Sequence, residues 1–391
     1  MKILVYAGIV SPHMIPLCDK LATILGKGNM LYCATLKMRE QRVKLGWREA
    51  ERDWIVRYNG MPPGDKIEEY AEIFDVLFAS EFCPKVIERF KARHKLIIYP
   101  SERWLKPPWG AIRFFKPSFI GRAKYFASLL NGYGRFIYLP IGPYAAKDAI
   151  RIARWARFGL PVLTSTDAFI FEKVPLGCFA AVNGKNYLLD KMRLWGYFVA
   201  PSKDVERPVQ SVSKTSPHEI KTLWVGRLLS WKCVDTIARA VGEHANCRRS
   251  DASLPKITLD IYGTGPEEAR LKKIASSYGD VVKFHPPVSV ADIRPIMRDH
   301  DVYVLGSNGY EGWGAVVSEA LEEGMEVVGT FEAGSSAAIL PESNLFHAGD
   351  WRSLLKILQY GAHEVSIGEW SAANAAEKLV KWLDDEVGHG S

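Results

Sequence analysis

Short apolar runs alternate with amphipathic or charged segments along most of the chain, and this alternation constrains the fold more than any other feature. In the first half the runs are residues 2–6, 30–33, 75–78, 95–99, 136–139, 161–164 and 197–200. Such runs fit buried strands of a parallel sheet, and the segments between them fit crossover helices. The pattern predicts a doubly wound α/β sheet, in which ligands bind beyond the carboxyl ends of the strands.

The alternation stops at a polar stretch and then starts again. We expect a linker at 204–217, with strands after it at 221–225, 257–262, 281–284, 302–305, 326–330 and 345–347. Helices are expected at 235–241, 267–277 and 291–298, and from near Asp350 and Glu369. The prediction is therefore two Rossmann-like domains, 1–203 and 218–368, which face a central cleft, and a final helix at 369–391 that packs back on the first domain.

Composition narrows the class of protein further. The chain has 391 residues, of which 48% are hydrophobic and 24% charged, as in a soluble globular protein of two domains. A formal charge of +7 favours a negatively charged partner. No apolar run is long enough to span a membrane, and the six cysteines lack metal-ligand spacing. We expect a cytoplasmic protein with reduced thiols and no bound metal.

The segment from Gly309 to Ala320 combines a strand end, a glycine loop and a helix start. It follows the apolar run 302–305 and carries two carboxylates, Glu311 and Glu319, eight positions apart. Unpaired amides at a helix start attract phosphate, and flanking carboxylates accept hydrogen bonds from sugar hydroxyls. Eight helical positions span about 12 Å, which matches the length of a nucleotide-sugar. The alternative is a solvated helix face after an ordinary glycine turn.

Two other strand ends of the second half carry groups suited to a diphosphate. Gly226 and Arg227 follow the run 221–225, and Lys232 precedes the next helix. A guanidinium and an ammonium together can hold phosphate oxygens. Gly263 and Gly265 end another strand in a turn before Pro266, which is a second place where backbone amides can meet a nucleotide.

The first half offers fewer charged residues at its strand ends. Gly8, Ser11 and His13 follow the first run, and His13 could donate a proton or simply pack near a helix start. Glu102 and Arg103 follow the fourth run, where they either contact a substrate or form a structural ion pair. These residues are candidates for the acceptor side of a site.

Residues 103–126 interleave cationic and aromatic side chains without a single acidic residue. The cations are Arg103, Lys106, Arg113, Lys116, Arg122 and Lys124, and the rings are Trp104, Trp109, Phe114, Phe115, Phe119, Tyr125 and Phe126. This composition suits the surface of an anionic membrane. It also suits single-stranded nucleic acid, which we do not expect as a partner, or an ordinary loop with its rings packed inward.

The motifs of the second half together resemble the signature of the retaining GT-B glycosyltransferases of family 4, over about 221–350. In that family the carboxyl-terminal domain binds the sugar-nucleotide, such as a UDP- or GDP-sugar, and the amino-terminal domain binds the acceptor. The resemblance implies that Arg227 and Lys232 hold the diphosphate, Glu311 the sugar and Glu319 the ribose. The backbone of Gly314, Ala315 and Val316 would bind the distal phosphate. The remaining donor-side residues by this resemblance are Gly226, Gly263, Gly265, Gly312 and Trp313.

The resemblance also implies a reaction that needs neither a cofactor nor a metal ion. Fixed cations would stabilise the charge that develops on the leaving diphosphate, and Glu102 would be a fourth catalytic candidate beside Glu311, Arg227 and Lys232. The acceptor would be a glycan or a lipid-linked hydroxyl at the inner membrane face. The chain departs from the family at Ser101–Arg103, where many members have a His-Asp pair, and at Cys233, which replaces a glycine. The alternative functions are an epimerase or phosphorylase on the same fold, or a non-catalytic binding protein.

Overall fold

The structure is a computed structural model that describes residues 1–40, 43, 48–158, 191–202, 219–362 and 365–388. These residues form two compact units, which are described separately. Unit 1 comprises Met1–Glu40, Arg48–Val199 and Glu369–Ser391, and unit 2 contains Ala200–Gly368. The expected linker at 204–217 and the expected strand at 161–164 lie outside the described residues.

Unit 1 is built on a parallel sheet of six strands in the order β3-β2-β1-β4-β5-β6. The strands are β1 (Ile3–Ala7), β2 (Met30–Ala34), β3 (Ile55–Arg57), β4 (Val76–Ala79), β5 (Leu96–Ser101) and β6 (Phe136–Pro140). Ile3 of β1 lies opposite both Met30 and Val76. All residues of β1, β4 and β6 are buried, as expected for strands covered on both faces.

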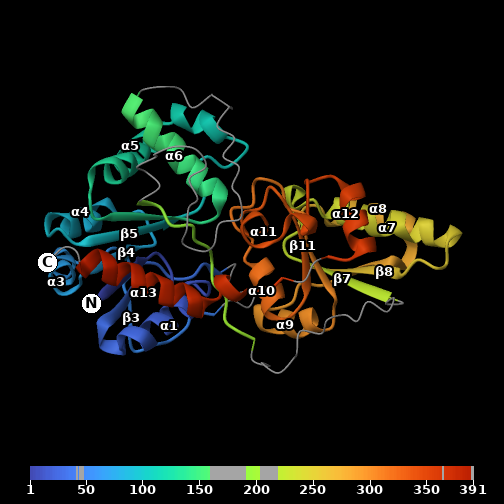
Figure 1. Cartoon of the computed structure of the whole chain (residues 1–391), viewed down its shortest axis with the longest axis horizontal. Coiled ribbons are helices and arrows are strands. Elements are labelled where there is room, and N and C mark those ends of the chain that lie inside the picture. The colour runs from blue at the N-terminus through green and yellow to red at the C-terminus, as the bar shows by residue number, and fades with distance from the viewer. Residues whose placement is uncertain (41–42, 44–47, 159–190, 203–218, 363–364, 389–391) are drawn as a thin grey trace. The chain divides into compact units, whose positions relative to one another are not determined.

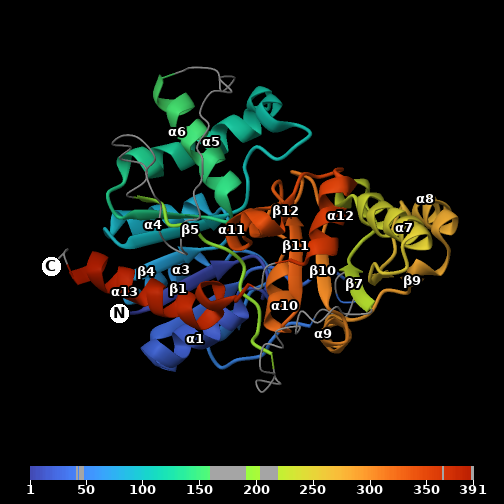
Figure 2. The same cartoon turned by 45° about the vertical axis from the view of Figure 1, so that its right-hand side comes forward.

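Helices cover the faces of this sheet (Figure 1). They are α1 (Ile15–Leu25), α3 (Gly64–Ile73), α4 (Pro84–Ala92), α5 (Pro117–Gly132), α6 (Pro143–Phe158) and α13 (Ala372–Gly388). Proline occupies the first turn of α1, α4 and α5, where its missing N–H costs no hydrogen bond. The last helix of the chain, α13, packs against α1 in this unit (Figure 2).

Unit 2 repeats the same architecture. Its strands are β7 (Glu219–Val225), β8 (Lys256–Tyr262), β9 (Val282–His285), β10 (Val302–Leu305), β11 (Glu326–Thr330) and β12 (Leu345–Phe346). Its helices are α7 (Val234–Ser250), α8 (Glu268–Ala275), α9 (Val290–Arg298), α10 (Val316–Glu322), α11 (Gly334–Ile339) and α12 (Trp351–Tyr360). The sheet order β12-β11-β10-β7-β8-β9, read from its other edge, is the order of unit 1. Both orders are that of a Rossmann fold.

Two strand predictions differ from the structure. The edge strand β3 was not predicted, because it has only three residues and its apolar run is too short to indicate a strand. Residues 197–200 are not a strand, although Phe198 and Val199 are buried. The chain pairs with β6 a few residues earlier, through isolated bridges at Met192 and Trp195. Burial alone therefore produced the apolar run at 197–200.

Candidate functional site

The loops that carry the predicted donor residues meet at one point of the unit 2 sheet. β7 is the first strand of this unit, and it pairs with β8 on one side and with β10 on the other. The connections leave β7 and β10 in opposite directions, so a crevice forms beyond the carboxyl ends of these two strands. Gly226 and Arg227 follow β7, and Glu311 follows β10.

Lys232 and Glu311 are brought together there, although they are 79 positions apart. Lys232 Nζ forms an ion pair with Glu311 Oε2, and only 17% and 13% of the two side chains are exposed. Ser307 Oγ donates a further hydrogen bond of 3.2 Å to the same carboxylate oxygen. The ammonium has three donor hydrogens, so one bond to Glu311 leaves two for other acceptors. The cation and the carboxylate thus form one rigid polar unit.

Two aromatic rings that the sequence analysis did not assign support this pair. Trp231 and Tyr310 stack with centroids 6.4 Å apart, and Lys232 Nζ lies 4.4 Å from the centre of the Trp231 ring. The amide of Asn308 donates to the carbonyl of Trp231 at 2.9 Å, which ties the loop after β10 to the loop after β7. The sequence could have indicated both rings, because Trp231 directly precedes Lys232 and Tyr310 directly precedes Glu311.

Arg227 and the Gly263–Gly265 turn lie against one another. Arg227 is exposed and forms no ion pair with any of the described residues. A Cβ on Gly263 would stand 1.9 Å from the carbonyl oxygen of Gly226, and one on Gly265 would stand 2.4 Å from that of Leu228. Gly263 also has φ +154°. Close packing between the two loops therefore explains these glycines without a ligand, beside their predicted donor role.

The predicted donor residues around the start of α10 differ in how deeply they are buried. Trp313, a predicted donor residue, is only 1% exposed, so its indole packs in the core. Gly312 is buried too, whereas Gly314, Ala315 and Val316 are half-buried at the start of α10. Gly314 has φ +95°, a conformation that favours glycine.

Glu319 lies on α10 with an unusual electrostatic environment. Burial raises the pKa of its carboxyl, Arg294 opposes this shift and Glu323 adds to it. No side chain among the described residues donates a hydrogen bond to it. Burial also raises the pKa of the Tyr303 phenol, and the charges of Glu311 and Glu319 both contribute. The two predicted carboxylates are therefore within electrostatic reach of one buried group.

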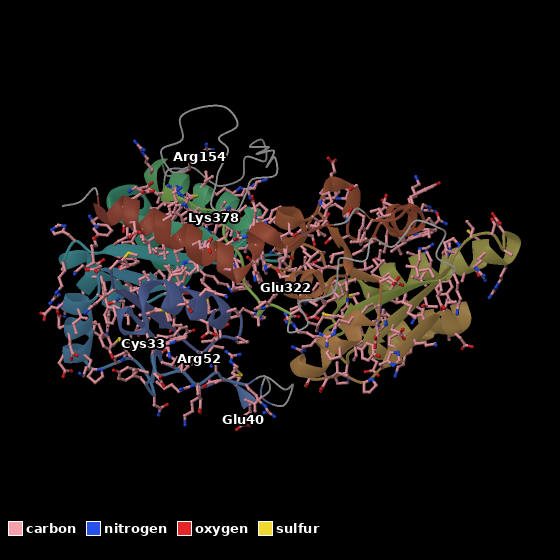
Figure 3. All side chains as sticks on the ribbon, turned by 60° about the horizontal axis from the view of Figure 1, so that its bottom comes forward. Cys33, Glu40, Arg52, Arg154, Glu322 and Lys378 are labelled. Carbon is pink, nitrogen blue, oxygen red and sulfur yellow. The ribbon has the colours of Figure 1, made fainter. Side chains whose placement is uncertain are left out.

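A buried ionic network fixes α10 in place. Glu323 accepts from Arg298 at 2.8 Å and from the hydroxyl of Ser202 at 3.0 Å, and it pairs with Arg294 at 3.2 Å. Glu322 (Figure 3) accepts from the amide of Ser202 at 3.4 Å. These contacts join α9, α10 and the segment 200–202 within unit 2. The sequence did not mark them, because their partners are distant along the chain.

Unit 1 has its own cavity, of about 310 Å³, beyond the carboxyl ends of β4, β5 and β6. Its lining includes Glu81, Phe82, Ser101, Glu102, Arg122 and Tyr197. Glu102 pairs with Lys106, and it accepts a 2.9 Å hydrogen bond from the Tyr197 hydroxyl. Glu81 accepts from Thr35 at 3.1 Å. Two carboxylates among aromatic rings are suited to a ligand that carries hydroxyl groups.

The structure separates the predicted pair Glu102 and Arg103. Arg103 pairs with the buried Asp148 at 3.4 Å and lies 5.1 Å from the ring centre of Tyr144. Burial raises the pKa of Asp148, and Arg103 acts against that rise. Arg103 thus has a structural partner, and Lys106 rather than Arg103 is the cation beside Glu102.

The residues after β1 lie near the same cavity. The ring of His13 stacks on Tyr197 with centroids 5.7 Å apart, and its backbone amide donates a 3.4 Å hydrogen bond to Ser11 Oγ. A Cβ on Gly8 would stand 3.4 Å from Glu81 Oε2. Sequence reasoning missed Glu81, although it follows β4, the strand that neighbours β1. The strand order, which the sequence did not supply, identifies that loop as part of the switch point.

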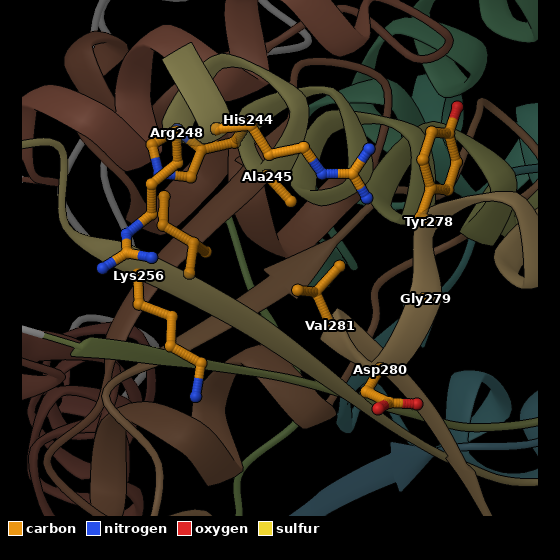
Figure 4. Close-up of a pocket in the computed structure, with 10 residues that line it drawn as sticks. His244, Ala245, Arg248, Lys256, Tyr278, Gly279, Asp280 and Val281 are labelled. Carbon is orange, nitrogen blue, oxygen red and sulfur yellow. The ribbon is translucent and has the colours of Figure 1, made fainter. Parts of the chain in front are cut away.

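Another cavity, of about 300 Å³, lies at the opposite edge of the unit 2 sheet (Figure 4). It is lined by His244, Arg248, Lys256 and Asp280 among others, at the amino-terminal ends of β8 and β9. Both ring nitrogens of His244 have partners, Pro255 O at 2.7 Å and Gln359 at 3.1 Å. This edge is the one that ligands of such sheets do not use.

The described residues contain neither a membrane-spanning helix nor a cluster of metal ligands. None of the described helices has both the length and the apolar composition needed to cross a membrane. Nor do the described His, Cys, Asp and Glu side chains form a group of three or more that could hold a metal ion.

Comparison with solved structures identifies the fold. HepE of Anabaena in complex with UDP and glucose aligns with a TM-score of 0.57 and 15% identity, over 98% of this chain and 99% of that one. A glycosyltransferase of Rickettsia africae gives a TM-score of 0.59 at 13% identity, over 99% and 98% of the two chains. The protein has the GT-B fold of two Rossmann-like domains.

The second unit is related at the level of sequence as well. Residues 219–359 match the family described as glycosyl transferases group 1, so unit 2 is similar to proteins of that group. It is 30% identical over 128 residues to the GtfA subunit of the UDP-N-acetylglucosamine–peptide N-acetylglucosaminyltransferase of Streptococcus agalactiae. That match covers 31% of this chain and about a quarter of the relative, 24%.

Proposed function

We propose that the protein is a retaining glycosyltransferase that moves a sugar from a nucleotide-diphosphate donor to a hydroxyl of a glycan or a lipid-linked acceptor. The observation that carries this proposal is the Lys232–Glu311 pair at the switch point of unit 2, inside the region that matches the group 1 family. HepE of Anabaena, which shares the fold, binds UDP and glucose. UDP-sugars are therefore the first donors to test.

The proposed roles follow from the charges of these groups. Lys232 would hold Glu311 with one hydrogen and a diphosphate oxygen with another, while Arg227 would reach the same diphosphate with its planar fork. Glu311 would accept hydrogen bonds from the sugar hydroxyls, and Glu319 from the ribose. Fixed cations at the leaving group would make a metal ion unnecessary.

In the proposed reaction the bond between the anomeric carbon and the diphosphate oxygen breaks as the acceptor oxygen bonds to that carbon on the same face. The acceptor proton passes to the departing phosphate oxygen, so no separate base is required. Lys232 and Arg227 stabilise the negative charge that develops on the leaving group, which favours the transition state over bound donor. Glu102 would orient the acceptor hydroxyl.

The test is release of nucleoside diphosphate from a panel of UDP- and GDP-sugars, with and without glycan acceptors. We expect slow hydrolysis of at least one donor, and Lys232→Met should lower its rate about 100- to 1000-fold, the usual cost of one charge-stabilising donor. Lys273 is an exposed lysine on α8, so Lys273→Met is the matched control and should leave the rate unchanged.

Each rival gives a different product from the same panel. An epimerase would interconvert donor sugars without releasing nucleotide, and a phosphorylase would require inorganic phosphate and form a sugar phosphate. If no sugar-nucleotide is bound or hydrolysed and Lys232→Met changes nothing, the proposal fails in favour of a non-catalytic binding protein.

A further inference from the structure

Three large apolar side chains protrude from unit 1 just before α5. Trp109 is 50% exposed, Ile112 is 54% exposed and Phe115 is 85% exposed. They lie on or next to the 3₁₀ helix η2 (Gly110–Phe115), in the chain segment that leads into α5 (Figure 2). Isolated exposed apolar residues are common, but three of them at successive turns are a surface feature.

The helix type explains why these three residues share one side. A 3₁₀ helix has three residues per turn, so side chains at positions i and i+3 lie one above the other. Ile112 and Phe115 have this spacing within η2, and Trp109 directly precedes the helix, where its carbonyl accepts a 2.7 Å hydrogen bond from the amide of Ile112. Phe114 points the other way, with ring contacts to Phe119 at 5.2 Å and Trp155 at 4.7 Å.

The rest of the aromatic stretch is inside the protein. Trp104 is 7% exposed and stacks on the buried Phe126 with centroids 4.8 Å apart. The stretch 103–126 is therefore neither an inward-packed loop nor a continuous aromatic surface. Its inner rings anchor the segment to the core, and the outer three, which we call the η2 face, remain available.

The cations of the stretch divide in the same way. Arg103 and Lys106 are engaged with Asp148 and Glu102, and Arg113 donates to the carbonyl of Trp104. Lys116, Arg122 and Lys124 are exposed. Lys116 Nζ lies 4.9 Å from the ring centre of Trp109, and so the positive charge borders the η2 face directly.

The size and charge of the η2 face favour a lipid surface over a second copy of the chain. At about 200 Å² for a large apolar side chain, the three exposed fractions sum to roughly 400 Å². A stable protein interface needs about 800 Å² from each partner. A membrane needs less, because a few rings enter the headgroup layer while cations attract anionic lipids.

We propose that the η2 face, together with Lys116 and Lys124, docks unit 1 onto an anionic lipid surface. Arg122 lines the cavity of unit 1 and lies 5.7 Å from the ring centre of Trp104, an inner ring of the same stretch, so the stretch 103–126 borders that cavity. Docking would bring the cavity close to the headgroups, which fits a lipid-linked acceptor. The docking does not depend on the proposed transfer reaction.

The experiment is flotation of the full chain with vesicles of phosphatidylcholine alone or with 30% phosphatidylglycerol. We expect binding to the anionic vesicles that weakens as salt rises. Trp109→Ser with Ile112→Ser and Phe115→Ser should weaken it at least tenfold, and Lys116→Glu with Lys124→Glu severalfold. Thermal unfolding of each variant should match the parent, because all five side chains are exposed.

A second triple variant is the matched control. Ile24→Ser with Ile73→Ser and Tyr360→Ser removes exposed apolar residues elsewhere and should leave vesicle binding intact. The proposal is overturned if the η2 triple variant binds as the parent does, or if both triple variants lose binding equally. It is also overturned if the parent is a dimer that the η2 substitutions dissociate, or if a short oligonucleotide rather than lipid binds the face.

Discussion

The two units share one strand order but differ in what lies at their switch points. In unit 2 the crevice has an ion pair, Lys232–Glu311, and backbone loops pressed together at Gly263. In unit 1 it has the carboxylates Glu81 and Glu102 among aromatic rings. Topology thus decides where each candidate site lies, and the loops decide its chemistry: a cation suited to the proposed diphosphate in unit 2 and carboxylates suited to hydroxyl groups in unit 1.

The difference in backbone packing gives the largest expected effect on stability. Gly263→Ala forces a Cβ to within 1.9 Å of a carbonyl oxygen at φ +154°, so we expect a loss of about 2–3 kcal/mol in unfolding free energy. Gly8→Ala, in the loop after β1 of unit 1, meets only the Glu81 side chain and that of Leu36, at 3.4 Å or more, and should cost under about 1 kcal/mol. Urea denaturation of the full chain measures both. Equal losses would mean that the two loops are packed alike.

The buried carboxylate of unit 2 should show itself in a pH profile. Because the pKa of Glu319 is raised, its charged form is lost at a higher pH than for an ordinary glutamate, and donor affinity should decline below that pKa. Glu319→Gln should weaken donor binding about tenfold at neutral pH, the loss of one hydrogen bond to a charged group, and remove the pH dependence.

The same raised pKa predicts an opposite effect on folding. At pH values between the pKa of Glu319 in the unfolded state and its raised pKa in the folded state, the folded state binds more protons than the unfolded state. The free energy of unfolding therefore falls as the pH rises through this range. Glu319→Gln should therefore stabilise the protein at neutral pH while it weakens donor binding. Glu322→Gln changes another carboxylate of α10, one that bonds to Ser202, and is the control. It should leave donor affinity unchanged, and an equal loss would mean that the effect comes from a change in α10 itself.

The smallest expected effect concerns the acceptor side. Tyr197→Phe removes a hydrogen bond that orients the Glu102 carboxylate, so we expect KM for the acceptor to rise only about threefold, because Tyr197 acts through Glu102, while donor hydrolysis is unchanged. Tyr133→Phe, whose hydroxyl instead donates to the carbonyl of Lys95, should have no effect on either. A change in donor hydrolysis with Tyr197→Phe would place this residue in the donor site and contradict the proposal that unit 1 binds only the acceptor.

The sequence predicted the chain's regular elements well where burial made strands apolar on both faces. The runs at 302–305 and 326–330 are β10 and β11 without any change of bounds. The strand prediction from the sequence failed at the three-residue β3, which is too short to recognise, and at 197–200, which is apolar but does not pair as a strand. For the site, the sequence identified Lys232 and Glu311 as separate candidates but not as an ion pair.

By itself the sequence determined the α/β class, the repeat of the alternation and the charged strand ends of unit 2. These features are local, since each depends on neighbours within one strand, turn or helix. Only the tertiary structure decided which strands are adjacent, and hence that Glu81 lies with Glu102 and Tyr197, that Trp104 and Trp313 are core residues, and that Lys232 meets Glu311. Such contacts join residues tens of positions apart, and a linear pattern does not contain the strand order that brings them together.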